Sequence, residues 1–448
     1  MEISKQTQTA GNLRNGSITP KRLCAGYAFL LTVAACLFGI TQTSALMLVV
    51  AALFAPLIFM PEFLLGPIVL FTIFDDYLLV GSSASVGRFV TLFFIAGALL
   101  VILKKGTIKQ ASLYFFLLLV FGVLLSFYST QGYTSLPISY ILNMILAVAM
   151  LNFSEVSTEE IAKQFFIYGV LALAFVYLLF MQNGFDSLVE GNRLTIDEET
   201  NSNQVAMGLA IVMALFVSNM LIFKKHKLIT ILLIVAVLVA LFFTGSRTAL
   251  IASIVMAFLL YLINAQDKRS KRKALLFLLF GTALFGLIYR ILEDAYPLLM
   301  ERFTMENIEE SGGTGRLDVW KNYFIHFFPK YWFIGMGFDP LNLFYGLGSL
   351  FAEKHGAHNL LVEVLSKSGV VGLILYAVCF VKFFRATTKQ LQANKYLLLP
   401  IAIVLTTLVN GLGEDVLTGR FLWFGIGLGY MLLHNGVNEN KNALGRNP

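Results

Sequence analysis

Long apolar stretches separated by short polar connections run through almost the whole chain. A membrane-spanning helix needs about 20 mostly apolar residues, with a range of about 17 to 25. Fourteen stretches approach this length, near residues 23–41, 45–60, 63–80, 87–103, 111–128, 134–152, 161–181, 204–223, 228–243, 247–265, 274–292, 359–384, 396–412 and 420–434. They are continuous rather than alternating, which predicts helices and not the strands of a membrane barrel. We therefore expect an all-α fold, a polytopic transmembrane helical bundle of about 12–14 spans.

The composition agrees with a membrane protein. Of the 448 residues, 58% are hydrophobic and only 13% are charged, whereas about a quarter of a soluble domain is charged. This excludes a soluble enzyme, a nucleic-acid-binding protein and a secreted disulfide scaffold. The three cysteines, Cys24, Cys36 and Cys379, lie inside apolar stretches and form no CxxC pair, so neither a disulfide framework nor a zinc site is expected.

The first apolar stretch has the shape of a signal sequence, because it follows a tail that contains Lys21 and Arg22. The apolar stretch continues beyond Cys36, however, and another begins a few residues later. We therefore expect an uncleaved first span rather than a removed signal peptide.

Basic residues indicate the orientation of the bundle. The net charge is +7, and most of the excess lies in four short connections, at 104–109, 224–227, 268–273 and 382–395. Cytoplasmic connections carry an excess of Lys and Arg, and with fourteen spans all four clusters and both termini fall on one side. That side is predicted to be the cytoplasm. The opposite side then receives the connections at 183–203, 244–246, 293–358 and 413–419.

The connection 293–358 is far longer than ordinary connections, and its aromatic residues argue against disorder. Apolar residues recur in it at helical spacing: Leu317, Trp320, Phe324 and Phe327. We expect one large ordered extracytoplasmic loop that contains amphipathic helices, with this helix lying at the membrane surface and ending at Pro329.

The chain then divides into four regions: a cytoplasmic polar tail (1–22), N-terminal transmembrane helices (23–182), a candidate catalytic region with the outer loop (183–384), and C-terminal transmembrane helices and tail (385–448).

Three arginines lie on the predicted outward side, where the excess of Lys and Arg in cytoplasmic connections does not explain them. They are Arg193, Arg247 and Arg316. Arg247 begins a span behind Ser246, a candidate N-cap. Helix N-termini and guanidinium groups both favour phosphate oxygens, so these arginines can hold a diphosphate. The alternative is that each arginine extends to the interface or pairs with a nearby acid such as Glu190, Glu301 or Asp318.

His358 lies just before a span and is followed by Asn359 and Glu363. Histidine is the side chain best suited to accept a proton near neutral pH, and an acid at membrane depth is a functional candidate. His358 is therefore a candidate base, with His355 and Glu363 as the next candidates. The alternatives are that His358 caps the helix and that Glu363 neutralises an outward arginine.

No metal or nucleotide site is expected. Asp75 and Asp76 form the only adjacent aspartate pair, which is not a DxD motif, and we expect pairing with Arg88. The glycine-flanked segment that ends at Arg88 lacks the lysine of a phosphate-binding loop.

Four short motifs occur in a fixed order along the second half of the chain. They are Ser246-Arg247-Thr248-Ala249, Thr314-Gly315-Arg316-Leu317 with Trp320, Gly335-Met336-Gly337-Phe338, and His358-Asn359-Leu360-Leu361 followed by Gly369 and Gly372. Together they resemble the O-antigen ligase and polymerase superfamily of bacterial membranes. The resemblance covers roughly residues 190 to 375, and the first 180 residues match only as generic spans.

The resemblance implies a metal-independent, inverting glycosyltransferase of cell-surface polysaccharide biosynthesis, without a cofactor, in the bacterial cytoplasmic (inner) membrane. It would take glycan from a polyprenyl diphosphate-linked oligosaccharide on the outer face and pass it to the hydroxyl of an acceptor glycan. By position, Arg247 and Arg316 would hold the diphosphate and His358 would activate the acceptor. The remaining substrate-binding candidates are Arg193, Asn203, Ser246, Trp320, Asn359 and Glu363.

A repeat-unit polymerase is our leading interpretation, and an O-antigen ligase that transfers glycan to the lipid A core is the alternative. The competing classes are a transporter or flippase of lipid-linked glycans and a non-catalytic partner of polysaccharide assembly proteins. No nucleic-acid partner is expected.

Overall fold

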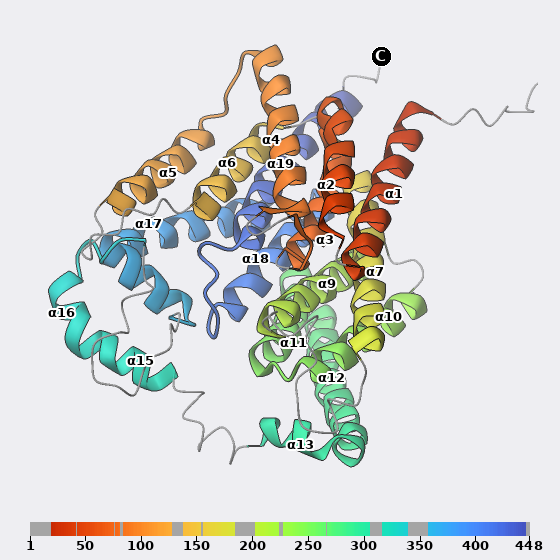
Figure 1. Ribbon diagram of the computed structural model, residues 1–448, viewed down its shortest axis with the longest axis vertical. Coiled ribbons are helices and arrows are strands. Elements are labelled where there is room, and N and C mark those ends of the chain that lie inside the picture. Colours follow the sequence, from red (N-terminus) through yellow and green to blue (C-terminus); the bar gives the residue numbers. More distant parts are fainter. Residues whose placement is uncertain are drawn as a thin grey trace, which may run out of the picture.

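The structure is a computed structural model. It describes residues 19–41, 43–75, 77–80, 84–127, 138–153, 156–183, 202–223, 227–265, 267–304, 316–338 and 357–444. The described part of the chain is a helical bundle with one small antiparallel sheet, whose two strands have two residues each (Figure 1).

The N-terminal part contains α1 (Pro20–Ile40), α2 (Ser44–Leu53), two 3₁₀ turns at Ala55–Phe59 and Pro61–Leu64, α3 (Leu65–Ile73), β1 (Leu79–Val80), β2 (Ala84–Ser85), α4 (Val86–Lys105), α5 (Ala111–Phe127), α6 (Ile138–Asn152) and α7 (Thr158–Asn183). The central part contains α9 (Ser202–Phe223), α10 (Lys227–Thr244), α11 (Arg247–Asn264) and α12 (Lys268–Ala295). After the loop layer described below, the C-terminal part contains α17 (Leu360–Gln390), a 3₁₀ turn at Lys395–Leu397, α18 (Leu398–Asn410) and α19 (Arg420–Leu444).

The all-α polytopic membrane fold is confirmed. Each of the fourteen predicted stretches contains a helix within its described residues, and eight of the described helices are long and apolar enough to cross a membrane. The second and third stretches are broken into 3₁₀ turns, with Pro56 and Pro61 at the starts of these turns. Proline lacks the N–H that would continue a straight helix.

Helix α9 lies at the centre of the bundle. It packs against α10, α11 and α18, and 78% of the residues in its most apolar part are buried. Helix α19 packs against α6 and α18. Helix α12 is peripheral, because only 12% of the residues in its most apolar part are buried. Most of its apolar surface is therefore available to lipid.

The long connection forms a layer of short helices at one end of the bundle, which we call the loop layer (residues 297–304 and 316–338). It comprises α13 (Pro297–Met300), a 3₁₀ turn at Glu301–Phe303, α15 (Arg316–Asn322), a π-helical turn at Tyr323–Phe327 and α16 (Phe328–Tyr331). In Figure 1, α13 lies at the bottom and α15 and α16 lie at the left in the lower half, whereas α1 begins at the top.

The prediction that Pro329 ends the amphipathic helix was wrong. The helical path continues to Tyr331, and Pro329 lies in the first turn of α16. A first-turn residue needs no N–H partner within its helix, so the π-helical turn and the restart of the helix accommodate the proline.

The loop layer is joined to a break in α17 by backbone contacts. Gly369 has non-helical dihedral angles (φ 61°, ψ −163°). Four backbone hydrogen bonds cross the junction: from Met336 N–H to Ser366 O, from Gly337 N–H to Lys367 O, from Val370 N–H to Trp332 O and from Val371 N–H to Phe333 O. The groups freed by the break in α17 are therefore paired with the loop layer, as burial requires.

Candidate active site

The site is organised by the segment between α18 and α19, which we call the connecting segment (residues 411–419). The Asn359 side chain donates to Leu412 O (3.1 Å), and its oxygen accepts the N–H groups of Leu361 and Val362, capping α17. The connecting segment is thereby fixed against the start of α17.

A buried carboxylate makes the second attachment. Oε2 of Glu363 accepts the N–H groups of Val416 and Leu417 at 2.9 and 3.0 Å, and Oε1 pairs with Lys367 one turn away. The hypothesis that Glu363 neutralises an outward arginine is therefore wrong, because both of its oxygens are used elsewhere. Since Glu363 is only 1% exposed, it is structural support for the connecting segment in this arrangement.

These attachments bring Glu414 between Arg316 and His358. Nη2 of Arg316 lies 3.1 Å from Oε1 of Glu414, and Nδ1 of His358 lies 3.3 Å from Oε2 of the same carboxylate. All three side chains are partly buried. One carboxylate thus bridges the predicted phosphate-binding arginine and the predicted base.

Arg247 and Arg302 add two further guanidinium groups. Nη1 of Arg247 and Nε of Arg302 are buried and have no hydrogen-bond partner within the described chain. Both Arg302 and Arg316 act electrostatically on Arg247. Like charges with unsatisfied donors are costly unless an anion joins them, so the cluster fits a multiply charged anion.

A close approach at Gly413 brings α11 and α15 together. A Cβ atom at this position would lie 2.6 Å from Oγ1 of Thr248 and 3.0 Å from Nη1 of Arg316. Glycine therefore allows the residue that follows Arg247 and the Arg316 guanidinium to meet at the connecting segment.

His358 has an unusual backbone conformation and a raised pKa. Its φ is 47°, in the left-handed region that non-glycine residues rarely adopt and that is enriched at functional sites. The hydrogen bond to Glu414 raises the pKa of His358 above its usual value. Burial raises the pKa of the neighbouring Asp415 to about 6.

Ser246 occupies the N-cap position of α11, as predicted, but its hydroxyl makes no capping hydrogen bond. Its N–H instead faces Oγ1 of Thr244 at 3.4 Å. The backbone before Ser246 turns through Gly245, whose φ is 61°. The first-turn N–H groups of α11 are thus not capped by Ser246.

Trp320 positions the start of α17. Its indole N–H donates to Ala357 O (2.8 Å), and the ring packs on the cluster that contains Tyr323 and Met336. Because Ala357 precedes His358, this bond ties α15 to the predicted base.

The other predicted residues lie elsewhere or outside the description. Asn203 lies in the first turn of α9. Arg193 and His355 lie outside the described residues. Asp75 does pair with Arg88, at 3.8 Å, and it also pairs with Arg420, which the sequence analysis missed.

Three residues of the site were not predicted from the sequence: Arg302, Glu414 and Asp415. The outward position of the connection 413–419 was the available signal for the two acids, because acids on the side of unexplained arginines are their natural partners. Within the described chain, no three His, Cys, Asp or Glu side chains gather as metal ligands.

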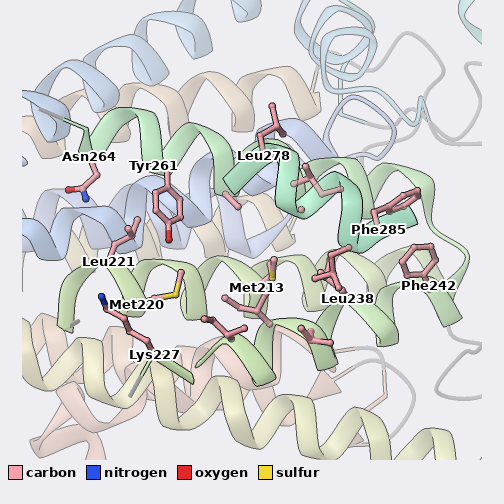
Figure 2. Close-up of a pocket in the computed structure, with 17 residues that line it drawn as sticks. Met213, Met220, Leu221, Lys227, Leu238, Phe242, Tyr261, Asn264, Leu278 and Phe285 are labelled. Atoms are coloured by element: carbon pink, nitrogen blue, oxygen red, sulfur yellow. The ribbon is translucent and has the colours of Figure 1, made fainter. Parts of the chain in front are cut away.

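An apolar cavity of about 500 Å³ lies between α9, α10, α11 and α12. Figure 2 shows Lys227, Tyr261 and Asn264 toward one end and Phe242 and Phe285 toward the other. The ring of Phe242 also lies 5.6 Å from that of Phe303, the neighbour of Arg302. The cavity therefore runs along the bundle to the edge of the arginine cluster.

Residues 231–377 match the family described as O-antigen ligase. This range contains Arg247, Arg302, Arg316 and His358. This segment is similar to the O-antigen ligase family. The chain is also 29% identical over 233 residues to an O-antigen ligase of Pseudomonas aeruginosa. The match covers 50% of this chain and 51% of that protein, so the chain spans about half the length of this relative.

These matches confirm the resemblance to the O-antigen ligase and polymerase superfamily. The matches and the apolar helices together indicate a membrane protein that is similar to O-antigen ligase-like proteins of polysaccharide biosynthesis. Glu414 and Arg420 lie beyond the matched range, so their contacts come from the structure alone.

Proposed function

We propose that the protein is a membrane glycosyltransferase that transfers glycan from a polyprenyl diphosphate carrier to an acceptor sugar hydroxyl on the outer face of the bacterial cytoplasmic membrane. The main observation in support is the cluster of Arg247, Arg302 and Arg316 beside His358 and Glu414. The match of residues 231–377 to the O-antigen ligase family supports this class of reaction independently.

The arginines would stabilise the leaving group. When the bond between the anomeric carbon and the diphosphate oxygen breaks, its electron pair stays on the diphosphate. Fixed guanidinium groups in a poorly hydrated site stabilise that developing charge, and they offer paired N–H groups to phosphate oxygens. The buried Nη1 of Arg247 and Nε of Arg302 are donors without protein partners in the described chain.

His358 would accept the proton of the acceptor. With its Nδ1–H donating to Glu414, Nε2 is left to take the proton as the acceptor oxygen bonds to the anomeric carbon. Attack opposite the departing diphosphate inverts that carbon. The arginines supply the charge that a metal would otherwise supply, so the proposed step needs no metal.

The carrier tail would lie in the apolar cavity of Figure 2. The cavity passes along α10 and α12 and ends beside Phe303, next to Arg302. A lipid held there would bring its head group to the arginine cluster while its chain remained within the bundle.

We propose a repeat-unit polymerase as the specific activity, with ligation to the lipid A core as the alternative. Both use the same donor chemistry. A transporter is less well supported, because its polar site would lie near the middle of the membrane, whereas this cluster lies at helix ends.

The test is glycan transfer by the purified protein, mixed with lipid-linked repeat units in detergent without a membrane gradient. Arg247→Ala, Arg302→Ala and Arg316→Ala are each expected to lower the rate by about 100-fold or more. Arg316→Lys is also expected to be damaging, because the two-pronged contact is lost. Arg290→Ala is the matched control, since this arginine of α12 is 84% exposed and pairs with Glu293 of the same helix.

Wild-type rates in the three cluster variants would remove the proposed role of the arginines. A wild-type protein that binds lipid-linked glycan without extending or transferring it would favour a transporter or scaffold.

A further inference from the structure

A second cavity, of about 240 Å³, lies where the connecting segment enters α19. Its wall combines residues from the ends of α3, α4, α6, α9 and α19. Its polar side chains are Thr72, Asp75, Tyr77, Arg88, Ser139, Asn143, Gln204, Thr418 and Arg420. This lining differs from that of the apolar cavity in Figure 2, so the second cavity is suited to a polar ligand.

The inner wall is a buried ion pair. Arg420 is 8% exposed, and its Nη2 donates to both oxygens of Asp75 at 3.3 and 3.1 Å. Its Nη1 donates to Thr72 Oγ1 at 3.3 Å. Its Nε is buried and has no partner within the described chain. A buried donor left unpaired in a cavity wall needs an explanation, and a bound ligand provides one.

The ion pair depends on a glycine in α4. A Cβ atom at Gly87 would lie 2.8 Å from Oδ1 of Asp75 and 2.9 Å from Nη1 of Arg420. The Ser85 hydroxyl also donates to Asp75. The carboxylate is therefore held in one orientation, which a site that distinguishes ligands by hydrogen bonds requires.

The outer wall presents two exposed, uncharged side chains beside the partly exposed Arg88. Ser139 at the start of α6 and Gln204 at the start of α9 are both exposed. Hydroxyl and amide groups both donate and accept hydrogen bonds, as sugar hydroxyls do. The cavity is smaller than the about 300 to 1,000 Å³ of sites for drug-sized ligands, so it suits a single sugar ring.

The connecting segment links this cavity to the candidate active site. Glu414 contacts His358, and four residues later Thr418 O accepts the side-chain N–H of Asn143 at 2.9 Å. The six-residue step from Glu414 to Arg420 spans at most about 20 Å when fully extended. A short oligosaccharide bound in the cavity is thus within reach of His358.

We propose that the second cavity is a saccharide subsite that holds a non-reacting ring of the acceptor glycan while the acceptor hydroxyl lies at His358. The proposal rests on the glycosyltransferase function above. Asp75 pairs with both Arg88 and Arg420, so a carboxylate already occupies the two guanidinium groups that a phosphate group would need.

The test measures binding of a lipid-free oligosaccharide, released by mild acid from the host's lipid-linked glycan, to the full-length protein in detergent. The doubly substituted Ser139→Ala, Gln204→Leu protein is expected to bind at least roughly fivefold more weakly, since two hydrogen bonds are lost. Gln182→Leu is the matched control, because Gln182 is an exposed residue at the end of α7 that does not line the cavity. Arg247→Ala should bind the oligosaccharide like the wild type, because its contact is with the donor.

Equal binding by the doubly substituted protein and the control, or no binding by the wild type, would overturn the subsite. Inorganic phosphate that competes with the oligosaccharide for the cavity would overturn it in favour of an anion site. Failure of the glycosyltransferase function is seen separately, as absent transfer from lipid-linked donor by a wild-type protein that still binds the oligosaccharide.

Discussion

Glu414 joins the cationic and basic halves of the candidate site through its two carboxylate oxygens. One oxygen contacts Arg316 and the other contacts His358. A diphosphate that binds Arg316 would compete with Glu414 for the guanidinium. Glu414 would then interact mainly with His358 and stabilise its protonated form as the acceptor loses its proton.

Glu414→Gln is expected to move the acid limb of the pH–rate profile to lower pH. The carboxylate raises the pKa of His358, and the base must be unprotonated, so the rate rises as pH passes that pKa. Removing the negative charge lowers the pKa of His358 and shifts the rise toward acid. The plateau should fall by about 10 to 100-fold, because the imidazolium is less stabilised. The measurement is the transfer rate between pH 5 and 9.

Asp415→Asn is the control for this experiment. Asp415 also raises the pKa of His358, but by a weaker electrostatic effect than that of the Glu414 hydrogen bond. The acid limb of the pH–rate profile of Asp415→Asn should therefore move in the same direction as that of Glu414→Gln, but by a smaller amount. An acid limb that stays in place in Glu414→Gln would show that His358 is not the group that titrates.

The sequence identified one side of this contact and missed the other. Arg247, Arg316 and His358 stood out because charge patterning gave the orientation and short motifs marked the positions. The partner of Arg316 lies 98 residues away in the chain, so only the fold reveals that pair. Arg302 carried no motif and became notable only through its buried Nε.

At the scale of elements, the junction between the loop layer and α17 holds Arg316 in place. A Cβ atom at Gly369 would lie 2.3 Å from Phe333 O, and one at Gly335 would lie 2.5 Å from Ser368 N. Both glycines have positive φ angles, 61° and 80°. Neither position can accept a side chain without separating the two backbones.

Gly369→Ala is therefore expected to detach the loop layer from α17. Strained backbone alone costs about 1–3 kcal/mol, and the steric clash adds to it. Transfer should fall below one tenth of the wild-type rate while the bundle stays folded. The checks are the transfer rate and the protease sensitivity of residues 316–338. Gly286→Ala is the control, since a Cβ atom there meets nothing within 4 Å; equal activity of both variants would contradict the role of the junction.

The elements were predicted better than their interruptions. Each predicted apolar stretch contains a helix in its described residues, because burial in lipid requires backbone hydrogen bonds within the segment itself. The break at Gly369 was not predicted, because it depends on partners from residues 332–337 and not on the local pattern. The same holds for Pro329, whose stop signal was overridden by the π-helical turn.

For the whole molecule, the central prediction is that the loop layer and the connecting segment face outward. In Figure 1 the start of α1 lies at the top of the view, whereas α13 and α15 lie in its lower part. The basic residues Lys104 and Lys105 lie in the last turn of α4, which the charge rule assigns to the cytoplasm.

Two cysteine substitutions test this orientation in intact cells. Leu412→Cys in the connecting segment and Ile108→Cys between α4 and α5 are both exposed, at 65% and 72%. In a background with Cys24→Ala, a membrane-impermeant maleimide should label Cys at position 412 in intact cells. Position 108 should react only after lysis, and the reverse result would invert the topology and move the site to the cytoplasm.

The attachment of the loop layer to α17 has an evolutionary consequence. Its four hydrogen bonds join main chain to main chain, so apart from the glycines they do not depend on which side chains residues 332–337 carry. Related chains are free to vary the exposed surface of this layer to suit new acceptors while Arg316 keeps its position. Acceptor preference can then diverge among relatives without any rebuilding of the chemistry.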